Sequence, residues 1–516
     1  MPTSAKLVSS PSLQQLLLGD AELALLDVRE QGVHYRGHPF FACSAPLSRL
    51  EMMIADLVPR RTVPIIVLDG GGEGLAEKAA ARLEALGYGD VSVLDGGCRG
   101  WKEAGFELFS GVNVPSKAFG EFVEHHDNTP RIPPETLHGY LQSGRKMVVL
   151  DSRPFEEYTR MNIPGGVDVP GAELAWRVHD LAPDPDTLVV VNCAGRTRSI
   201  IGCQSLRNAG IPNEVVALKD GTMGWDLAGF ECERGSTRVA AAPSASGKEK
   251  ALQAAQRVAE RFRVAFCTPE QVQAWQADGN RTLYLLDVRT REEFEGSHVK
   301  GSRHAPGGQL VQASDEYVGV RNARVVLIDP ERVRAVMTAS WLNQMGWNDV
   351  YVLDGEMEKE AGPRKQPVLQ LQSWETTKEA KGSILDFSTS LRFYHRHIPG
   401  AWWVVRSRLA EAKQKVGDAK ELTLTSEDAT LAHLAAPEVA ALWRGAEVKV
   451  LEGGNAAWKG EWEAGVERAT TVRDDVWYKP YDHASDYQKH ARDYLAWEVA
   501  LVEQIRRDPT IRFRAY

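Results

Sequence analysis

One cysteine in this chain has neighbours suited to nucleophilic sulfur chemistry. Cys193 closely follows an apolar, β-branched run, Leu188–Val191, and precedes small and basic residues that include Arg196 and Arg198. The run is typical of a buried strand, and a helix is expected to begin at Ser199. A helix N-terminus with neighbouring arginines stabilises a thiolate. We therefore expect a reactive thiolate at Cys193, although the alternative of an inert, buried cysteine is common in proteins.

The composition sets limits on the class of protein. A chain of 516 residues is too long for one core, and we expect three or four domains. The net charge of −9, with 25% charged residues, gives no indication of nucleic-acid or membrane partners. Six scattered cysteines form neither a disulfide framework nor a metal-ligand spacing. Residues 1–21 lack a signal-peptide pattern and no apolar run reaches membrane-spanning length, so we expect a cytoplasmic protein.

An internal repeat organises the chain. The pattern Asp-x-Arg follows an apolar run three times, and a fourth, degenerate copy has serine in place of arginine. The aspartates of these copies are Asp27, Asp151, Asp287 and Asp386. A second β-like run ends 42 residues after each of the first three aspartates and 40 residues after the fourth. The residues at these ends are Asp69, Cys193, Asp329 and Ser426. The chain is therefore predicted to contain four copies of one unit.

Each copy alternates apolar strands with helical patterns. Such alternation predicts an α/β fold in which a central, mostly parallel sheet is flanked by helices. Binding sites in this architecture form at the carboxyl ends of the strands, and Cys193 is expected at such an end. A later strand and glycine turn is followed by tryptophan in three copies, at Trp101, Trp225 and Trp458. We expect these tryptophans to lie in the cores.

Taken together, these motifs resemble those of the rhodanese-like sulfurtransferase family, repeated four times in tandem. The resemblance rests on the Asp-x-Arg strand, the small turn after it, the strand-Cys-loop-helix and the later Gly-Gly turn with tryptophan. It implies an enzyme whose catalytic cysteine carries sulfane sulfur as a persulfide. Only Cys193 matches that cysteine, because the other three positions hold aspartate or serine.

The length of the loop separates two chemistries within the wider family. The resemblance implies a six-residue loop for sulfurtransferases, here Cys193 to Arg198, whereas related phosphatases use a longer loop. A phosphatase would have arginine at the position of Ser199. The pocket is therefore expected to suit sulfur better than phosphate.

The resemblance also implies the roles of the loop residues. Cys193 would take the outer sulfur of a small anionic donor such as thiosulfate and pass it to a nucleophilic acceptor. The backbone of Ala194, Gly195, Thr197 and Ser199 would stabilise the persulfide anion, while Arg196 and Arg198 would bind the donor. Either arginine could instead form a salt bridge. Two-domain relatives place a substrate-binding arginine where this chain has Glu157, and Arg177 is a candidate substitute.

Other motif residues have structural interpretations. Asp151 and Arg153 recur in copies without cysteine, which favours a buried ion pair. Cys203 would lie one turn into the helix after the loop and is expected to be a small core residue rather than a resolving thiol. The histidine pairs lack the partners of a metal site, so neither metal nor cofactor is expected. The expected partners are a small sulfur donor and acceptor, with a sulfur-accepting protein as a further candidate.

The repeats define the predicted boundaries. Rhodanese-like units without a catalytic cysteine are expected at 1–115, 264–362 and, in degenerate form, 372–467, while the catalytic unit spans 125–235. Residues 236–263 would form a linker and a short helix, and 468–516 a helical C-terminal tail with Ser485 as its N-cap. Two other hypotheses stay open: a non-catalytic scaffold in which Cys193 senses oxidation, and a phosphatase-like enzyme.

Overall fold

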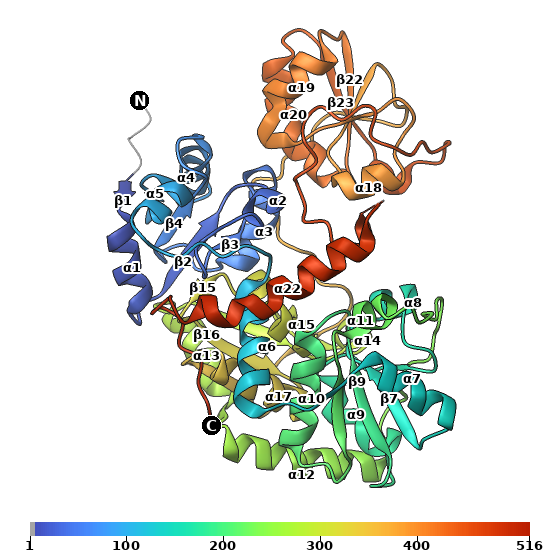
Figure 1. Ribbon diagram of the computed structural model, residues 1–516. Helices are drawn as coiled ribbons and strands as arrows, with labels where there is room; N and C mark the ends of the chain where they lie inside the picture. The colour runs from blue at the N-terminus through green and yellow to red at the C-terminus, as the bar shows by residue number, and fades with distance from the viewer. Residues whose placement is uncertain (1–5, 484) are drawn as a thin grey trace. The chain divides into compact units, whose positions relative to one another are not determined.

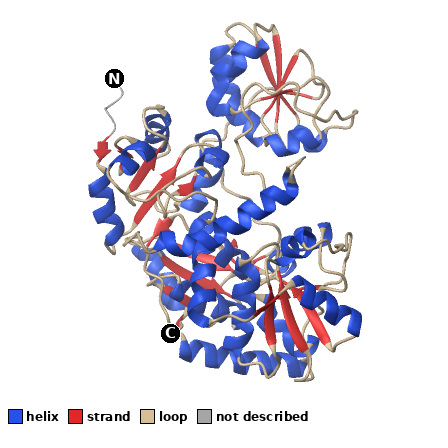
Figure 2. Ribbon diagram, viewed as in Figure 1, coloured by secondary structure: helices blue, strands red, loops and turns tan. Residues whose placement is uncertain are grey.

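The computed structural model describes residues 6–483 and 485–516, which form four main parallel sheets flanked by helices (Figures 1 and 2). The principal strands of each main sheet come from one of the predicted repeats. When these strands are numbered along a repeat, the order across each main sheet is 1-5-4-2-3. Helical crossovers join parallel strands of this kind, as the alternating sequence pattern predicted. The fourth, degenerate repeat thus has the same topology as the others.

The first repeat contains β1 (Lys6–Val8), β2 (Leu23–Asp27), β3 (Cys43–Ser44), β4 (Ile65–Leu68) and β5 (Val91–Leu94). Its helices are α1 (Ser10–Leu18), α2 (Gln31–His34), η1 (Leu47–Arg49), α3 (Leu50–Leu57), α4 (Leu75–Ala85) and α5 (Gly97–Glu103). The second repeat contains β6 (Arg131–Ile132), β7 (Met147–Asp151), β8 (Val167–Asp168), β9 (Leu188–Asn192) and β10 (Val215–Leu218). Its helices are α6 (Val114–Asp127), α7 (Pro134–Ser143), α8 (Phe155–Arg160), α9 (Glu173–Leu181), α10 (Thr197–Ala209) and α11 (Gly221–Leu227).

The third repeat follows α12 (Ala245–Arg261) and has more short strands than the others. They are β11 (Ala265–Cys267), β12 (Leu283–Asp287), β13 (His298–Val299), β14 (Arg303–His304), β15 (Val320–Arg321), β16 (Arg324–Ile328), β17 (Val350–Leu353) and β18 (Lys359–Glu360). Its helices are α13 (Pro269–Asp278), α14 (Arg291–Gly296), α15 (Gly307–Gln312), α16 (Ser314–Tyr317) and α17 (Val333–Gln344).

The fourth repeat contains β19 (Thr376–Thr377), β20 (Ser383–Asp386), β21 (Trp402–Trp403), β22 (Glu421–Thr425) and β23 (Glu447–Leu451). Its helices are α18 (Ser390–His395), η2 (Arg406–Arg408), α19 (Leu409–Val416), α20 (Thr430–Leu442) and α21 (Gly454–Ala457), and η3 (Pro480–Asp482) and α22 (Tyr487–Ile505) follow. Among the described residues, no helix combines the length and the apolar character that crossing a membrane requires.

The repeats are grouped into two compact units. Of the described residues, one unit comprises 6–13, 24–112 and 366–483, and so holds most of the first repeat and the fourth. The other comprises 14–23, 113–365 and 485–516, and so holds the second and third repeats together with α12 and α22. Cys193 belongs to this second unit.

Three local expectations need correction. The helix in the predicted linker is not short: α12 has 17 residues, because Ser244 caps its start and one face of it is buried. In the C-terminal tail the described helices are the short η3 and α22, and the N-cap of α22 is Asp486 rather than Ser485. Trp101 and Trp225 are buried in their cores as expected, whereas Trp458 is only half-buried.

The Asp-x-Arg motif closes the carboxyl end of the second principal strand. Arg153 donates two hydrogen bonds to Asp151, of 2.8 and 2.7 Å, and both side chains are buried. Asp287 and Arg289 form the same pair in the third repeat. In every repeat the backbone N–H two residues on donates to the aspartate, and in the fourth repeat, which lacks the arginine, the Asn455 side-chain amide donates to Asp386 at 2.9 Å. These contacts support a structural role for the motif.

The corresponding pair in the first repeat predicts an acid-sensitive stability. Burial raises the pKa of Asp27, but hydrogen bonds from Arg29 and His34 outweigh it and hold the pKa well below its usual range. The aspartate therefore stabilises the folded state above its unfolded pKa of about 4, and this contribution is lost as the pH falls below that value. We expect Asp27→Asn to lower the free energy of unfolding by about 3–5 kcal/mol at pH 7.

Urea unfolding between pH 3 and 7 measures both effects. The stability of the variant should change less with pH than that of the wild type. Asp90→Asn is the matched control, because the Asp90 ion pair with Lys6 is exposed and should contribute at most about 1 kcal/mol. Equal losses in the two variants would contradict a buried, structural pair at Asp27.

Candidate active site

Cys193 lies at the carboxyl end of β9, in the short loop that leads into α10. The helix begins at Thr197, two residues earlier than the sequence pattern indicated. The Cys193 side chain is buried, and its Sγ lies 3.4 Å from the Ser199 Oγ. The Ser199 hydroxyl donates to the Arg196 carbonyl at 2.8 Å. The loop therefore places Cys193 at a helix N-terminus, as predicted, and it also brings the Sγ close to the Ser199 hydroxyl.

Helix α11 holds the loop from one side. The backbone N–H of Thr222 donates to the Cys193 carbonyl at 2.8 Å, and that of Met223 donates to the Ala194 carbonyl at 2.9 Å. Because a trans peptide places its C=O and N–H on opposite sides, the N–H groups of Ala194 and Gly195 point away from α11. An anion on the side of the loop opposite α11 can accept from them.

The end of β9 is also tied to its neighbours. The Asn192 side-chain amide donates to Asp151 and to the Thr222 hydroxyl, both at 3.0 Å. The Thr222 hydroxyl in turn donates to the Cys193 carbonyl at 3.0 Å. The buried Asp151–Arg153 pair and α11 are thus joined through Asn192, which fixes the backbone on which Cys193 sits.

Gly221 permits the contact between α11 and the loop. Its φ is +58°, and an added Cβ would lie 2.5 Å from the Cys193 carbonyl oxygen and 2.7 Å from that of Gly195. We expect Gly221→Ala to displace the loop, to cost about 1–3 kcal/mol of stability and to reduce the sulfur-transfer activity that the family resemblance implies. Gly229→Ala is the matched control, because Gly229 also has a positive φ of +83° but open space around it.

Unfolding curves and steady-state assays on both glycine variants test this prediction. The control should lose some stability through backbone strain and keep its activity. Equal activity losses in Gly221→Ala and Gly229→Ala would show that close packing beneath the loop is not required.

The other repeats show what the loop geometry favours. In the first repeat Asp69 occupies the cysteine position, and its carboxylate accepts from the backbone N–H groups of Gly71, Leu75 and Ala76 at 2.8–3.2 Å. In the third repeat Asp329 accepts from the N–H groups of Glu331 and Arg334 at 3.2 and 2.8 Å. Two copies of the loop therefore hold a carboxylate against backbone N–H groups where the second repeat has sulfur, which indicates an anion-stabilising position.

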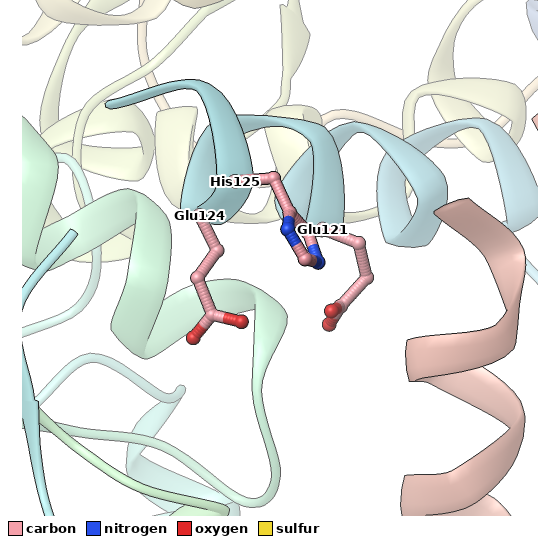
Figure 3. A group of neighbouring side chains, drawn as sticks. All are labelled: Glu121, Glu124 and His125. Carbon is pink, nitrogen blue, oxygen red and sulfur yellow. The ribbon is translucent and has the colours of Figure 1, made fainter. Parts of the chain in front are cut away.

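Arg196 is engaged by carboxylates. Its guanidinium donates to Glu121 at 2.6 and 2.7 Å, to Glu124 at 2.5 Å and to Asp220 at 3.1 Å, and its side chain is 4% exposed. Figure 3 shows Glu121, Glu124 and His125 on α6, close enough together to resemble a metal-ligand group. The ion pairs with Arg196 account for the position of the two carboxylates. The structure therefore places Arg196 as an anchor between the loop and α6.

Arg198 and Arg177 also meet carboxylates. Arg198 donates to Glu157 at 2.7 and 3.1 Å, so the glutamate that replaces the arginine of two-domain relatives pairs with the loop arginine. The third repeat has the same pair, Arg334 with Glu293, at the corresponding positions. Arg177 donates to Glu173 at 2.6 Å and to two backbone carbonyls. The structure shows no contact between Arg177 and the loop among the described residues.

A cavity lies beside the start of α10. It is open to solvent, with a volume of about 460 Å³ that includes part of the solvent at its mouth, and it is lined mainly by small and apolar residues of the second and third repeats. Thr197 and Arg198 line it on the α10 side, and Gly307, Gly308 and Trp341 are among the residues opposite. The cavity therefore reaches the loop arginine that pairs with Glu157.

Comparison with protein families decides the identity of the repeats. The model of the rhodanese-like domain matches residues 10–104, 134–228 and 268–360, which together make up more than half of the chain. The chain belongs to the rhodanese-like family. The family model does not extend to residues 372–467, where the fourth sheet of this rhodanese-like protein has the same strand order.

Individual relatives extend this result. The structure is similar over 99% of both chains to the crystal structure of thiosulfate sulfurtransferase from Pseudomonas aeruginosa, with 47% identity and a TM-score of 0.95. Single-repeat matches include the HTH-type transcriptional regulator Rv0324 of Mycobacterium tuberculosis, 35% identical over 18% of this chain and 39% of the regulator. The uncharacterized protein YqhL of Bacillus subtilis is 36% identical over 17% of this chain and 68% of YqhL.

The C-terminal helix of this rhodanese-like protein contributes residues that sequence analysis missed. Figure 1 shows α22 beside α6, and its Glu498 accepts from the Thr197 hydroxyl at 3.2 Å. A Cβ added to Gly195 would lie 3.3 Å from Glu498 and 3.4 Å from Tyr494. Lys117 of α6 lies near the same glutamate. One feature of the sequence indicated a special position for Glu498, because this charged residue lies on the apolar face of α22 between Leu495 and Leu501.

Proposed function

We propose that this rhodanese-like protein is a sulfurtransferase that moves sulfane sulfur from thiosulfate, or a similar anionic donor, to a thiophilic acceptor through a persulfide on Cys193. Similarity to a thiosulfate sulfurtransferase over the whole chain carries the proposal. The position of Cys193 at the anion-stabilising end of β9 supports it. The roles of individual residues below are part of the proposal.

The proposed first half-reaction is a displacement at sulfur. The Cys193 thiolate attacks the outer sulfur of thiosulfate, a new S–S bond forms, and the S–S bond of the donor breaks. The electron pair of the broken bond leaves with sulfite. In the second half-reaction an acceptor such as cyanide attacks the terminal sulfur of the persulfide, which yields thiocyanate and restores the thiolate. No outside oxidant or reductant is needed.

The loop stabilises the anions of both half-reactions. The backbone N–H groups of Ala194, Gly195, Thr197 and Ser199 are expected to face the persulfide, as those after Asp69 and Asp329 face a carboxylate. Preorganised donors of this kind act without reorganisation during the reaction.

Two arginines differ in their proposed roles. Arg198 borders the cavity beside α10 and is the loop arginine that we assign to donor binding, in exchange for part of its contact with Glu157. Arg196 is held by three carboxylates, and we assign it an anchoring role in place of the donor contact expected from sequence.

Steady-state kinetics with thiosulfate and cyanide test the proposed activity. Thiocyanate should form, and double-reciprocal plots at several fixed cyanide concentrations should be parallel, because sulfite leaves before cyanide reacts. Absence of thiocyanate with thiosulfate, mercaptopyruvate and glutathione persulfide alike would contradict the proposal. Oxidation of Cys193 without turnover would instead favour a redox-sensing scaffold.

A further inference from the structure

Three side chains from distant parts of the sequence meet beside the Cys193 loop. Lys117 of α6 places its Nζ 3.5 Å from a carboxylate oxygen of Glu498 and 5.9 Å from the ring centroid of Tyr494, both on α22. The Tyr494 hydroxyl donates to the same carboxylate at 3.0 Å. The side chain of Lys117 is 9% exposed and that of Glu498 is fully buried. An ammonium group is thus held in a dry environment next to the loop.

The same face of α6 contacts the loop along its length. An added Cβ at Gly120 would lie 2.8 Å from Thr197, so α6 and the start of α10 are closely packed there. Glu121, four residues after Lys117, pairs with Arg196. Residues four apart on a helix share a face, so Lys117 is on the side of α6 that faces the Cys193 loop. Its charge interacts with those of Cys193 and Arg198.

The ion-pair contact of Lys117 is longer than those of the two loop arginines. Charge-assisted N–H···O hydrogen bonds are usually 2.7–2.9 Å long, and Arg196 and Arg198 each make at least one contact of 2.7 Å or shorter. The Lys117 contact with Glu498 is 3.5 Å long. The other oxygen of Glu498 is buried and accepts no hydrogen bond from the described residues. Lys117 can therefore approach an added anion without breaking a short ion pair.

The proposed chemistry needs a cation at this place. Thiosulfate carries two negative charges and meets a thiolate that carries a third, and all three remain on the persulfide and the departing sulfite. Carboxylates already neutralise the positive charge of Arg196 and much of the positive charge of Arg198. A charge buried without a counter-charge is strongly destabilised. An additional cation beside the loop would therefore strongly stabilise a transition state that carries these negative charges.

We propose that Lys117, oriented by Glu498 and Tyr494 of the C-terminal helix, binds the sulfonate end of the donor and stabilises sulfite as it leaves Cys193. This inference rests on the proposed sulfurtransferase activity and adds a donor-binding residue outside the cysteine loop. It also gives α22 a function, because the helix holds the lysine in place. Lys117 contacts the donor, while Glu498 and Tyr494 are positioning residues.

The charges around Lys117 act on its protonation in opposite directions. The pKa of Lys117 is lowered overall, mainly by burial and further by Arg198, while Glu498 and Cys193 act to raise it. An arriving dianion would favour the protonated ammonium in the same way as Glu498. Burial and the neighbouring Glu498 charge raise the pKa of Tyr494, so its hydroxyl keeps the proton that it donates to Glu498.

Lys117→Gln, studied in the full-length protein, tests the inference. Its kcat/KM for thiosulfate should fall about 10- to 100-fold, as expected when one charged hydrogen-bond donor is lost, while kcat/KM for cyanide should stay near the wild-type value. The loss should be smaller with methanethiosulfonate, which carries the same sulfane sulfur but one negative charge. Lys117→Arg should recover part of the activity. Lys248→Gln, which removes an exposed lysine of α12, is the matched control.

Alkylation of Cys193 by iodoacetamide, a neutral reagent, reports whether the loop stays intact in Lys117→Gln. Glu498→Gln provides a second variant, which keeps the size of the side chain and should raise KM for thiosulfate more than it lowers kcat. An intact Lys117→Gln loop with unchanged kcat/KM for thiosulfate, or with equal losses for thiosulfate and cyanide, would overturn the inference. Failure of the wild type to form a persulfide would instead contradict the proposed function.

Discussion

Cys193→Ser is expected to lower thiocyanate formation at least about 1000-fold, because the serine hydroxyl cannot accept sulfane sulfur from the donor. The variant should fold normally, since the contact of the Sγ with Ser199 is 3.4 Å long and serine is nearly the same size. Incubation with thiosulfate should leave its mass unchanged. Steady-state assays combined with intact-mass measurement check both expectations.

Cys203→Ser is the matched control for this prediction. Cys203 lies in α10, and burial raises its pKa to about 12, so its thiol stays protonated and unreactive at neutral pH. Its Sγ lies 3.6 Å from the Val215 carbonyl oxygen, to which it can donate. Cys203→Ser should therefore keep its sulfur-transfer activity. Loss of activity in Cys203→Ser but not in Cys193→Ser would contradict the assignment of Cys193 as the cysteine that accepts sulfur.

Arg196→Met is expected to destabilise the unit that contains α6 and α10 by about 3–5 kcal/mol. The substitution removes one charge from a buried network and leaves Glu121, Glu124 and Asp220 without their common partner. Burial raises the pKa of Glu121 and Arg196 lowers it, so loss of the arginine should raise it further. Urea unfolding at neutral pH measures the loss of stability.

Arg131→Met is the control for Arg196→Met. Arg131 also pairs with Glu124, but its side chain is 42% exposed, and its removal should cost at most about 1 kcal/mol. A stable Arg196→Met variant with a raised KM for thiosulfate alone would support the donor-binding role that sequence analysis assigned to Arg196. A large loss of stability supports the anchoring role.

Local patterns were enough to predict the fold and the position of the cysteine. The strand, the cysteine and the helix start are contiguous, and the repeated spacing to Asp69 and Asp329 placed all three at equivalent ends of parallel strands. The short-range geometry of a strand and its following helix depends on neighbouring residues. The repeated Asp-x-Arg pair is similarly local, because its two partners lie two residues apart.

The partners of the arginines depend on contacts that the sequence pattern does not contain. Arg196 meets a carboxylate 75 residues away on α6, and Arg198 meets one 41 residues away on α8. The C-terminal helix is more distant still, since Thr197 and Glu498 are 301 residues apart. Helical periodicity predicted a helix in the C-terminal tail, but not the surface against which it packs. A single sequence shows which residues are charged but not how the packed helices pair those charges.

Intact-mass measurement of the wild-type protein tests the central claim most directly. After incubation with thiosulfate and removal of the donor, the chain should gain the mass of one sulfur atom, on a proteolytic fragment that contains Cys193. Cyanide should then remove that sulfur and release an equal amount of thiocyanate. Thiocyanate formation without any sulfur on Cys193 would contradict the persulfide mechanism, and so would a sulfur atom that cyanide does not remove.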